Sequence, residues 1–140
     1  MIADLSSLAT LQSEWAGAIQ MRERMRHLAV STLAFNALTS PAFGDILYNL
    51  PFRLAFDVLK QVLLKAREEG LFTSKGYQLG DLMDSAKASL SWNNWQALRE
   101  AVRRRNEVVH GGRLFGDEQC LHDMVDVEAQ LVAWRIITSV

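Results

Sequence analysis

The chain has 140 residues, 49% of them hydrophobic, and a formal net charge of −1. This length fits a single domain with a sizeable core, and the balanced charge argues against broad, non-specific binding to nucleic acids or membranes, which depends on many basic groups. The single cysteine, Cys120, excludes an intramolecular disulfide and favours a reducing compartment.

The first predicted helix runs from about Leu5 to about Phe35. Its apolar residues are spaced by three, by four or by sums of these, as one helix face requires: Leu5, Leu8, Trp15, Ile19, Leu28 and Ala29. Charged residues interrupt this segment, whereas a secretory signal has a continuous apolar region. No apolar run in the chain approaches the roughly 18 residues that a membrane span requires. We therefore expect a soluble, cytoplasmic protein without membrane contacts.

A second helical stretch is predicted to begin at Thr39-Ser40-Pro41, where a hydroxyl cap precedes proline at the first helical position. This helix should reach Pro51, whose missing backbone donor is expected to force a kink or a restart. The apolar pattern resumes at Phe52 and stops at Glu69-Gly70, with Gly70 as a left-handed cap.

Residues 71–80 form a predicted loop, and three helices follow it, at about Asp81 to Ser89, Asn93 to His110 and Glu118 to Thr138. The residues expected to face inward are Leu82, Met83 and Ala86 in the first of these, and Leu121, Met124, Val125, Val127, Leu131, Val132 and Ile136 in the last. Strand patterns are almost absent. The expected fold is an all-α, up-down bundle of four or five main helices, a single domain over residues 1–140.

The helix that ends in RRRNEVVHGG carries an arginine on its apolar face. At about 100° per residue, one stripe comprises Trp95, Leu98, Val102, Arg105 and Val109. Arg105 therefore points where an apolar residue is expected, which is costly unless its guanidinium is hydrogen-bonded or faces a wet cleft. Arg103 and Arg104 fall on the opposite, solvent-facing arc, where Glu100 and Arg104 form an i,i+4 pair.

Asn106 and His110 are also four residues apart, so they lie on one edge beside Arg105 near the helix C-terminus. The free carbonyls of the helix end favour a protonated imidazole. A histidine that exchanges a proton near neutral pH, beside a permanent cation, suits acid–base chemistry on a phosphodiester. Gly111-Gly112 end the helix and leave the imidazole uncrowded.

The stretch Arg105-Asn106-Glu107-Val108-Val109-His110-Gly111 resembles the signature of the HEPN superfamily (higher eukaryote and prokaryote nucleotide-binding domains). That signature is an arginine, four to six residues and a histidine, often with a polar residue directly after the arginine. Arg22 and His27 have the same spacing, but they lie mid-helix and lack the asparagine. The likeness covers about ten residues around this motif, and the rest of the chain agrees in architecture alone. Family members are small all-α bundles that dimerise with two motifs facing one another.

The resemblance implies a metal-independent endoribonuclease, of the kind found in toxin–antitoxin and phage-defence systems. Arg105 and His110 correspond to the family's catalytic pair, and Asn106 to its polar position. The RNA 2′-hydroxyl would attack the adjacent phosphorus, with the histidine assisting proton transfer and the arginine stabilising the phosphoryl charge, to give a 2′,3′-cyclic phosphate and a 5′-hydroxyl. Arg103 and Arg104 would hold the substrate backbone at the mouth of the cleft. The implied partners are RNA, a second copy of the chain and an antitoxin or other partner protein; no cofactor or metal is expected.

Two other interpretations stay open. One is an inactive HEPN-like helical module that binds nucleotide, RNA or a partner protein, which the near-zero net charge favours. The other is a structural bundle in which Arg105 pairs with an acid of another helix, Glu14 or Asp57, and His110 caps its own helix.

Further polar and aromatic residues are assigned structural roles. Residues His122-Asp123 and Asp126 are interpreted as a polar helix face rather than a metal site. Cys120, Trp92 and Trp95 are interpreted as core residues.

Overall fold

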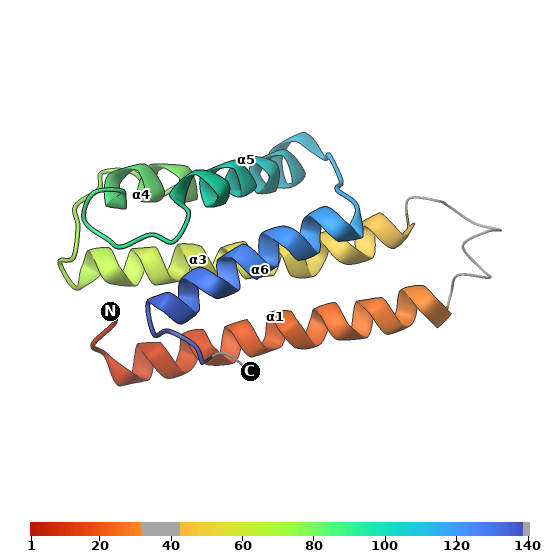
Figure 1. Cartoon of the computed structure of the whole chain (residues 1–140), viewed down its shortest axis with the longest axis horizontal. Coiled ribbons are helices and arrows are strands. Elements are labelled where there is room, and N and C mark those ends of the chain that lie inside the picture. The colour runs from red at the N-terminus through yellow and green to blue at the C-terminus, as the bar shows by residue number, and fades with distance from the viewer. Residues whose placement is uncertain (32–42, 139–140) are drawn as a thin grey trace.

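The protein is an all-α bundle built around one central helix (Figure 1). The computed structural model describes the backbone of residues 1–31 and 43–138 and the side chains of residues 1–27 and 49–138. The helices of this part are α1 (Leu5–Ser31), α3 (Phe43–Glu68), α4 (Leu79–Ala86), α5 (Trp95–Gly111) and α6 (Asp117–Ala133). α3 packs against each of the other four, and the long helices run in alternating directions, which confirms the expected up-down arrangement. None of the helices described here is long and apolar enough to cross a bilayer.

The first helix faces the bundle through Leu11, Trp15 and Ala18, all of which are buried. Leu5, the first residue of the predicted apolar face, is 78% exposed, so that part of the prediction is wrong. Ile2 is buried ahead of the helix instead, because the N-terminal backbone is tied to the end of α3: the Glu69 carboxylate accepts hydrogen bonds from the N–H groups of Ala3 (3.0 Å) and Asp4 (3.1 Å).

The central helix is continuous through Pro51, so of the two outcomes predicted there, a kink or a restart, the restart does not occur. Asn49 lies two residues before the proline and is buried. Its Nδ2 donates a hydrogen bond to the Phe115 carbonyl at 2.7 Å, and its Oδ1 accepts one from the Phe115 N–H at 3.1 Å. These bonds, and the burial of Phe52 directly after the proline, hold the turn in place despite the missing donor. The predicted start at Thr39-Ser40-Pro41, the end of the first helix at Phe35, and the side chains of Leu28 and Ala29 lie outside the described residues.

The ends of α3 and α5 follow the sequence prediction. Gly70 (φ 83°) and Gly112 (φ 68°) adopt the left-handed conformation that closes a helix. α5 begins at Trp95, with the side chain of Asn94 accepting a hydrogen bond from the Ala97 N–H at 3.0 Å. In α4, Leu82, Met83 and Ala86 are buried as expected.

The last helix ends at Ala133 instead of Thr138, and the chain turns at Arg135, whose φ is 59°. The Ile136 N–H donates back to the Leu131 carbonyl at 2.9 Å, as in a Schellman motif. The turn also brings the Ile136 carbonyl to the Gln12 side chain of α1 (2.9 Å). The predicted inward position of Val125 is wrong, because Val125 is 51% exposed.

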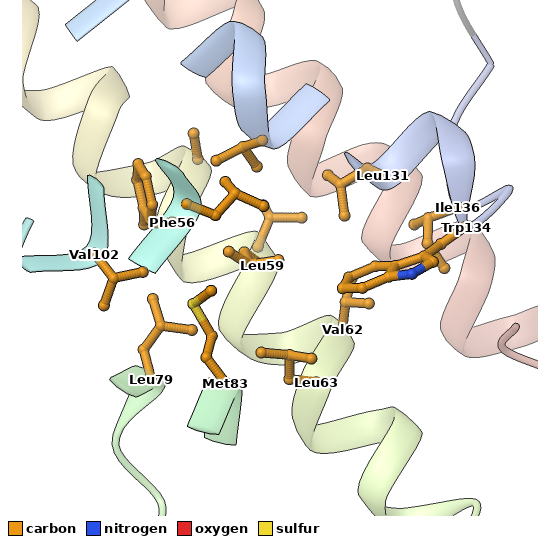
Figure 2. Packing of buried hydrophobic residues seen from close by; sticks show 14 of the residues in the cluster. Phe56, Leu59, Val62, Leu63, Leu79, Met83, Val102, Leu131, Trp134 and Ile136 are labelled. Atoms are coloured by element: carbon orange, nitrogen blue, oxygen red, sulfur yellow. The ribbon is translucent and has the colours of Figure 1, made fainter. Parts of the chain in front are cut away.

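The core lies where α3 meets the other helices (Figure 2). Phe56, Leu59, Val62 and Leu63 of α3 form its centre. Side chains from the other helices and the C-terminal segment surround them, namely Leu79, Met83, Val102, Leu131, Trp134 and Ile136. Cys120 is buried in this core, and Trp92 and Trp95 pack against it, as predicted. Val102 belongs to this core, so the first half of α5 is packed against it. The second half of α5 lies at the surface of the bundle.

Candidate functional site at the end of α5

The predicted catalytic residues lie where the apolar stripe of α5 leaves the core. Leu98, Ala101 and Val102 are buried, whereas most of the following residues up to Val109 are only partly buried. Arg105 continues the stripe as predicted, and its side chain is 11% exposed. The helix therefore directs a guanidinium towards α3 at the edge of the bundle.

Arg105 is held by Asp57 of α3, one of the two acids named as alternatives from the sequence. Its Nη2 donates to Asp57 Oδ1 at 2.8 Å, and its Nη1 donates to Asn106 Oδ1 at 3.3 Å. Its Nε is buried and has no hydrogen-bond partner among the described residues. The Asp57 side chain is 45% exposed, so the ion pair lies at the rim of the protein rather than sealed inside it.

His110 lies in the last turn of α5 and is exposed. It does not cap the helix, because the Glu107 carbonyl accepts from the backbone N–H groups of Gly112 and Arg113 instead. Within the described residues nothing hydrogen-bonds to its imidazole, which leaves both ring nitrogens open to a ligand. Asn106 lies four residues before His110 and so on the same edge of α5. The Asn106 side chain, however, accepts a hydrogen bond from Arg105.

Arg104 is not on a free, solvent-facing arc, and that prediction is wrong. Its Nε and Nη2 donate to the two carboxylate oxygens of Asp123 in α6, each at 2.8 Å, where the sequence pattern predicted a pair with Glu100. The hydrogen bonds to Asp123 raise the pKa of Arg104 above its usual value. Arg103, the preceding residue, is exposed.

Asp123 is fully buried, so residues His122-Asp123 and Asp126 are not simply a polar face. One potential ligand atom from each of His122, Asp123 and Asp126 lies within 4.8 Å of the others. Both Asp123 oxygens already accept hydrogen bonds, however, since Gln119 Nε2 donates to Oδ1 at 3.0 Å in addition to Arg104. The chemistry of this cluster is that of an interhelical ion pair.

A groove of about 470 Å³ runs between α1 and α3 and includes Asp57 in its lining. It adjoins a smaller polar hollow of about 210 Å³, with which it shares Glu14 and Gln61. The sequence does not reveal this groove, because the groove depends on how α1 and α3 pack against each other. It places a concave surface directly beside the acid that holds Arg105.

Comparisons of the chain with family models, with curated proteins and with solved structures find no match.

Proposed function

We propose that the protein is a metal-independent endoribonuclease of the HEPN type, acting at the C-terminal end of α5. The observation that carries the proposal is the incomplete hydrogen bonding of the Arg105 guanidinium. A guanidinium that is 11% exposed, with an unpartnered buried Nε, is held only by a neighbouring amide and by a carboxylate that is 45% exposed. A phosphate that reaches this rim can replace Asp57 with a charge-assisted, bidentate pair.

The proposed chemistry is an internal transesterification. The 2′-oxygen of the RNA bonds to the adjacent phosphorus, and the bond from phosphorus to the 5′-oxygen breaks. His110 removes the proton from the 2′-hydroxyl, and a second imidazole donates a proton to the departing 5′-oxygen. Arg105 stabilises the negative charge that develops on the phosphoryl oxygens, and Asn106 holds its guanidinium in position.

A second copy of the chain is part of this proposal. One motif contains one arginine and one histidine, whereas separate acid and base roles at one phosphate need two imidazoles. Two protomers that face one another across α5 supply both. Arg103 is exposed and suits a contact with the RNA backbone better than Arg104, whose guanidinium is engaged with Asp123. In a cell, such an activity would serve as a toxin or a phage-defence effector restrained by a partner protein.

The decisive experiment is RNA cleavage by purified protein in the presence of EDTA. We expect a 2′,3′-cyclic phosphate product, and a fall in rate of about 100-fold or more in Arg105→Ala and in His110→Ala. His27→Ala is the matched control, because His27 is also exposed and has an arginine at the same spacing. Unchanged cleavage in both motif variants would remove the proposal.

The second candidate is a non-catalytic module that binds nucleotide or RNA. The Arg105–Asp57 pair favours it, because a cation neutralised in the free protein contributes little to attracting RNA from a distance. Under this alternative, Arg105→Ala weakens nucleotide binding, and no cyclic phosphate forms at any protein concentration.

A further inference from the structure

The groove between α1 and α3 has an apolar floor and a polar rim. Ala18 and Val58 form the buried floor, and Leu54 and Met21 flank it. Its volume of about 470 Å³ lies within the range of small-molecule sites in proteins, about 300–1,000 Å³.

α1 contributes two small residues to the groove lining. Gly17 and Ala18 are adjacent in its lining, and a Cβ added at Gly17 would meet no atom within 4 Å. A larger side chain at residue 17 would therefore begin in open space on the groove lining and would not displace packed atoms at its Cβ. Glycine within a helix is destabilising compared with most residues, and at residue 17 it leaves part of the groove lining without a side chain.

Two of the three polar groups of the groove, Glu14 and Asp57, favour a ligand that donates hydrogen bonds, and the third, Gln61, can donate as well as accept. Glu14 and Asp57 offer carboxylates, which accept hydrogen bonds and cannot donate them when ionised. Asp57 is engaged with Arg105. In the described part of the chain, no ion pair or hydrogen bond involves the Glu14 carboxylate. A flat ring with adjacent N–H donors on one edge matches an apolar floor with one free carboxylate, and among the bases guanine presents that edge through N1–H and its amino group.

We infer that this groove binds a guanine base, with Glu14 accepting from its N1–H and amino group, while the attached phosphate reaches Arg105 beside Asp57. The inference rests on the proposed function and adds a base preference to it. The link between the two parts is Asp57, which lines the groove and lies 2.8 Å from the arginine. Unstacked bases of single-stranded RNA are commonly recognised in this way, on an apolar surface with polar contacts to one edge.

Binding of guanosine 5′-monophosphate and uridine 5′-monophosphate, measured by isothermal titration calorimetry, tests the inference without requiring catalysis. We expect the guanine nucleotide to bind about tenfold more tightly, as is typical of a bidentate contact to one base edge. Gly17→Leu should abolish this binding, because a leucine side chain on the groove lining would compete with the base for space. Ala16→Leu is the matched control, since Ala16 is an exposed neighbour outside the groove. Thermal melting of both variants checks that they are folded.

Substitution of the acceptor gives a second, milder test. Glu14→Gln should remove most of the preference for guanine, whereas Glu118→Gln, an exposed acid on α6, should leave it unchanged. Equal affinity for the two nucleotides, or undiminished binding by folded Gly17→Leu, would overturn the inference. So would a result in which Gly17→Leu changes only the oligomeric state in sedimentation experiments, because a second copy would then be the occupant of the groove.

The base site and the nuclease can fail separately. If guanosine 5′-monophosphate binds and Gly17→Leu abolishes binding, but no RNA is cleaved, the groove is supported and the nuclease is not. If RNA is cleaved without base preference and Gly17→Leu cleaves at the wild-type rate, the nuclease is supported and the guanine site is refuted.

Discussion

Two consecutive arginines of α5 differ sharply in their partners, and alanine substitutions should expose the difference in stability. Arg104 makes a two-pronged pair with Asp123, which is fully buried. Arg105 pairs with Asp57 through one hydrogen bond, and Asp57 is 45% exposed. We expect Arg104→Ala to destabilise the protein far more than Arg105→Ala.

The magnitudes follow from what each substitution leaves behind. Removing Arg104 strands the buried Asp123 carboxylate with Gln119 as its closest remaining donor, and breaking a buried pair typically costs about 3–5 kcal/mol. Because the Arg104 side chain is 26% exposed, water can enter its place, so we expect the lower end, about 3 kcal/mol. Removing Arg105 leaves Asp57 able to rehydrate, so the loss of a rim ion pair and of some packing sums to about 1 kcal/mol.

Urea unfolding monitored by circular dichroism measures both free energies, and thermal melting checks them. For a chain of this length about 3 kcal/mol corresponds to a drop in Tm of about 10–15 °C, and about 1 kcal/mol to about 3–5 °C. Equal destabilisation by the two substitutions would refute the reasoning. A large loss in Arg105→Ala alone would show that Arg105 is a structural arginine, and the nuclease proposal would lose its main support.

Three smaller predictions concern helix ends and termini. Gly112→Ala should cost about 1 kcal/mol in urea unfolding because Gly112 has φ 68°, whereas Gly111→Ala, inside the helix and in open space, should be neutral or slightly stabilising. Asn49→Ala should cost about 2 kcal/mol, since it removes two hydrogen bonds from a buried amide to the α5–α6 loop; wild-type stability would contradict the role given to it at the proline. Hydrogen bonds from backbone N–H groups lower the pKa of the Glu69 carboxyl below its usual 4.5. The ionised carboxylate therefore stabilises the folded protein at neutral pH, and this stabilisation is lost as the pH falls below that value. Glu69→Gln should therefore flatten the acid limb of the stability profile, and Glu68→Gln should not.

The sequence predicted the fold well because helical periodicity depends on neighbours along the chain. Local patterns were enough to predict the all-helical fold, the helix caps at Gly70 and Gly112, and the inward face of α4. The errors occurred where tertiary contacts decide. At Pro51 the helix does not restart, and Asn49 bonds there to a distant loop; at the C-terminus, Arg135 ends α6 early so that Ile136 can enter the core.

The site was predicted in part for the same reason. The three-four stripe identified Arg105 as an inward-facing cation, but it could not choose between Glu14 and Asp57, because that depends on how α1 and α5 sit on α3. Asp123 could have been found: it lies three residues after buried Cys120 and four before buried Val127, so the stripe rule applied to α6 would have identified it. A buried acid on α6 implies a basic partner, and Arg104 would then have been its candidate.

The geometry of the two arginines also predicts how the site depends on Arg104. Successive helical residues point about 100° apart, so α5 engages α6 through Arg104 and α3 through Arg105 only at one rotation about its axis. Loss of Arg104 should therefore reduce RNA cleavage by loosening the end of α5.

The double variant Arg104→Met/Asp123→Leu separates this role from a direct RNA contact, because apolar replacement of a buried pair is often neutral or stabilising. If the role is positional, the double variant regains both stability and cleavage. If Arg104 binds an RNA phosphate, the double variant is stable but binds RNA more weakly, with the salt dependence of affinity lowered by about one unit. Because both donating nitrogens of the Arg104–Asp123 pair are engaged at 2.8 Å, we expect the first outcome.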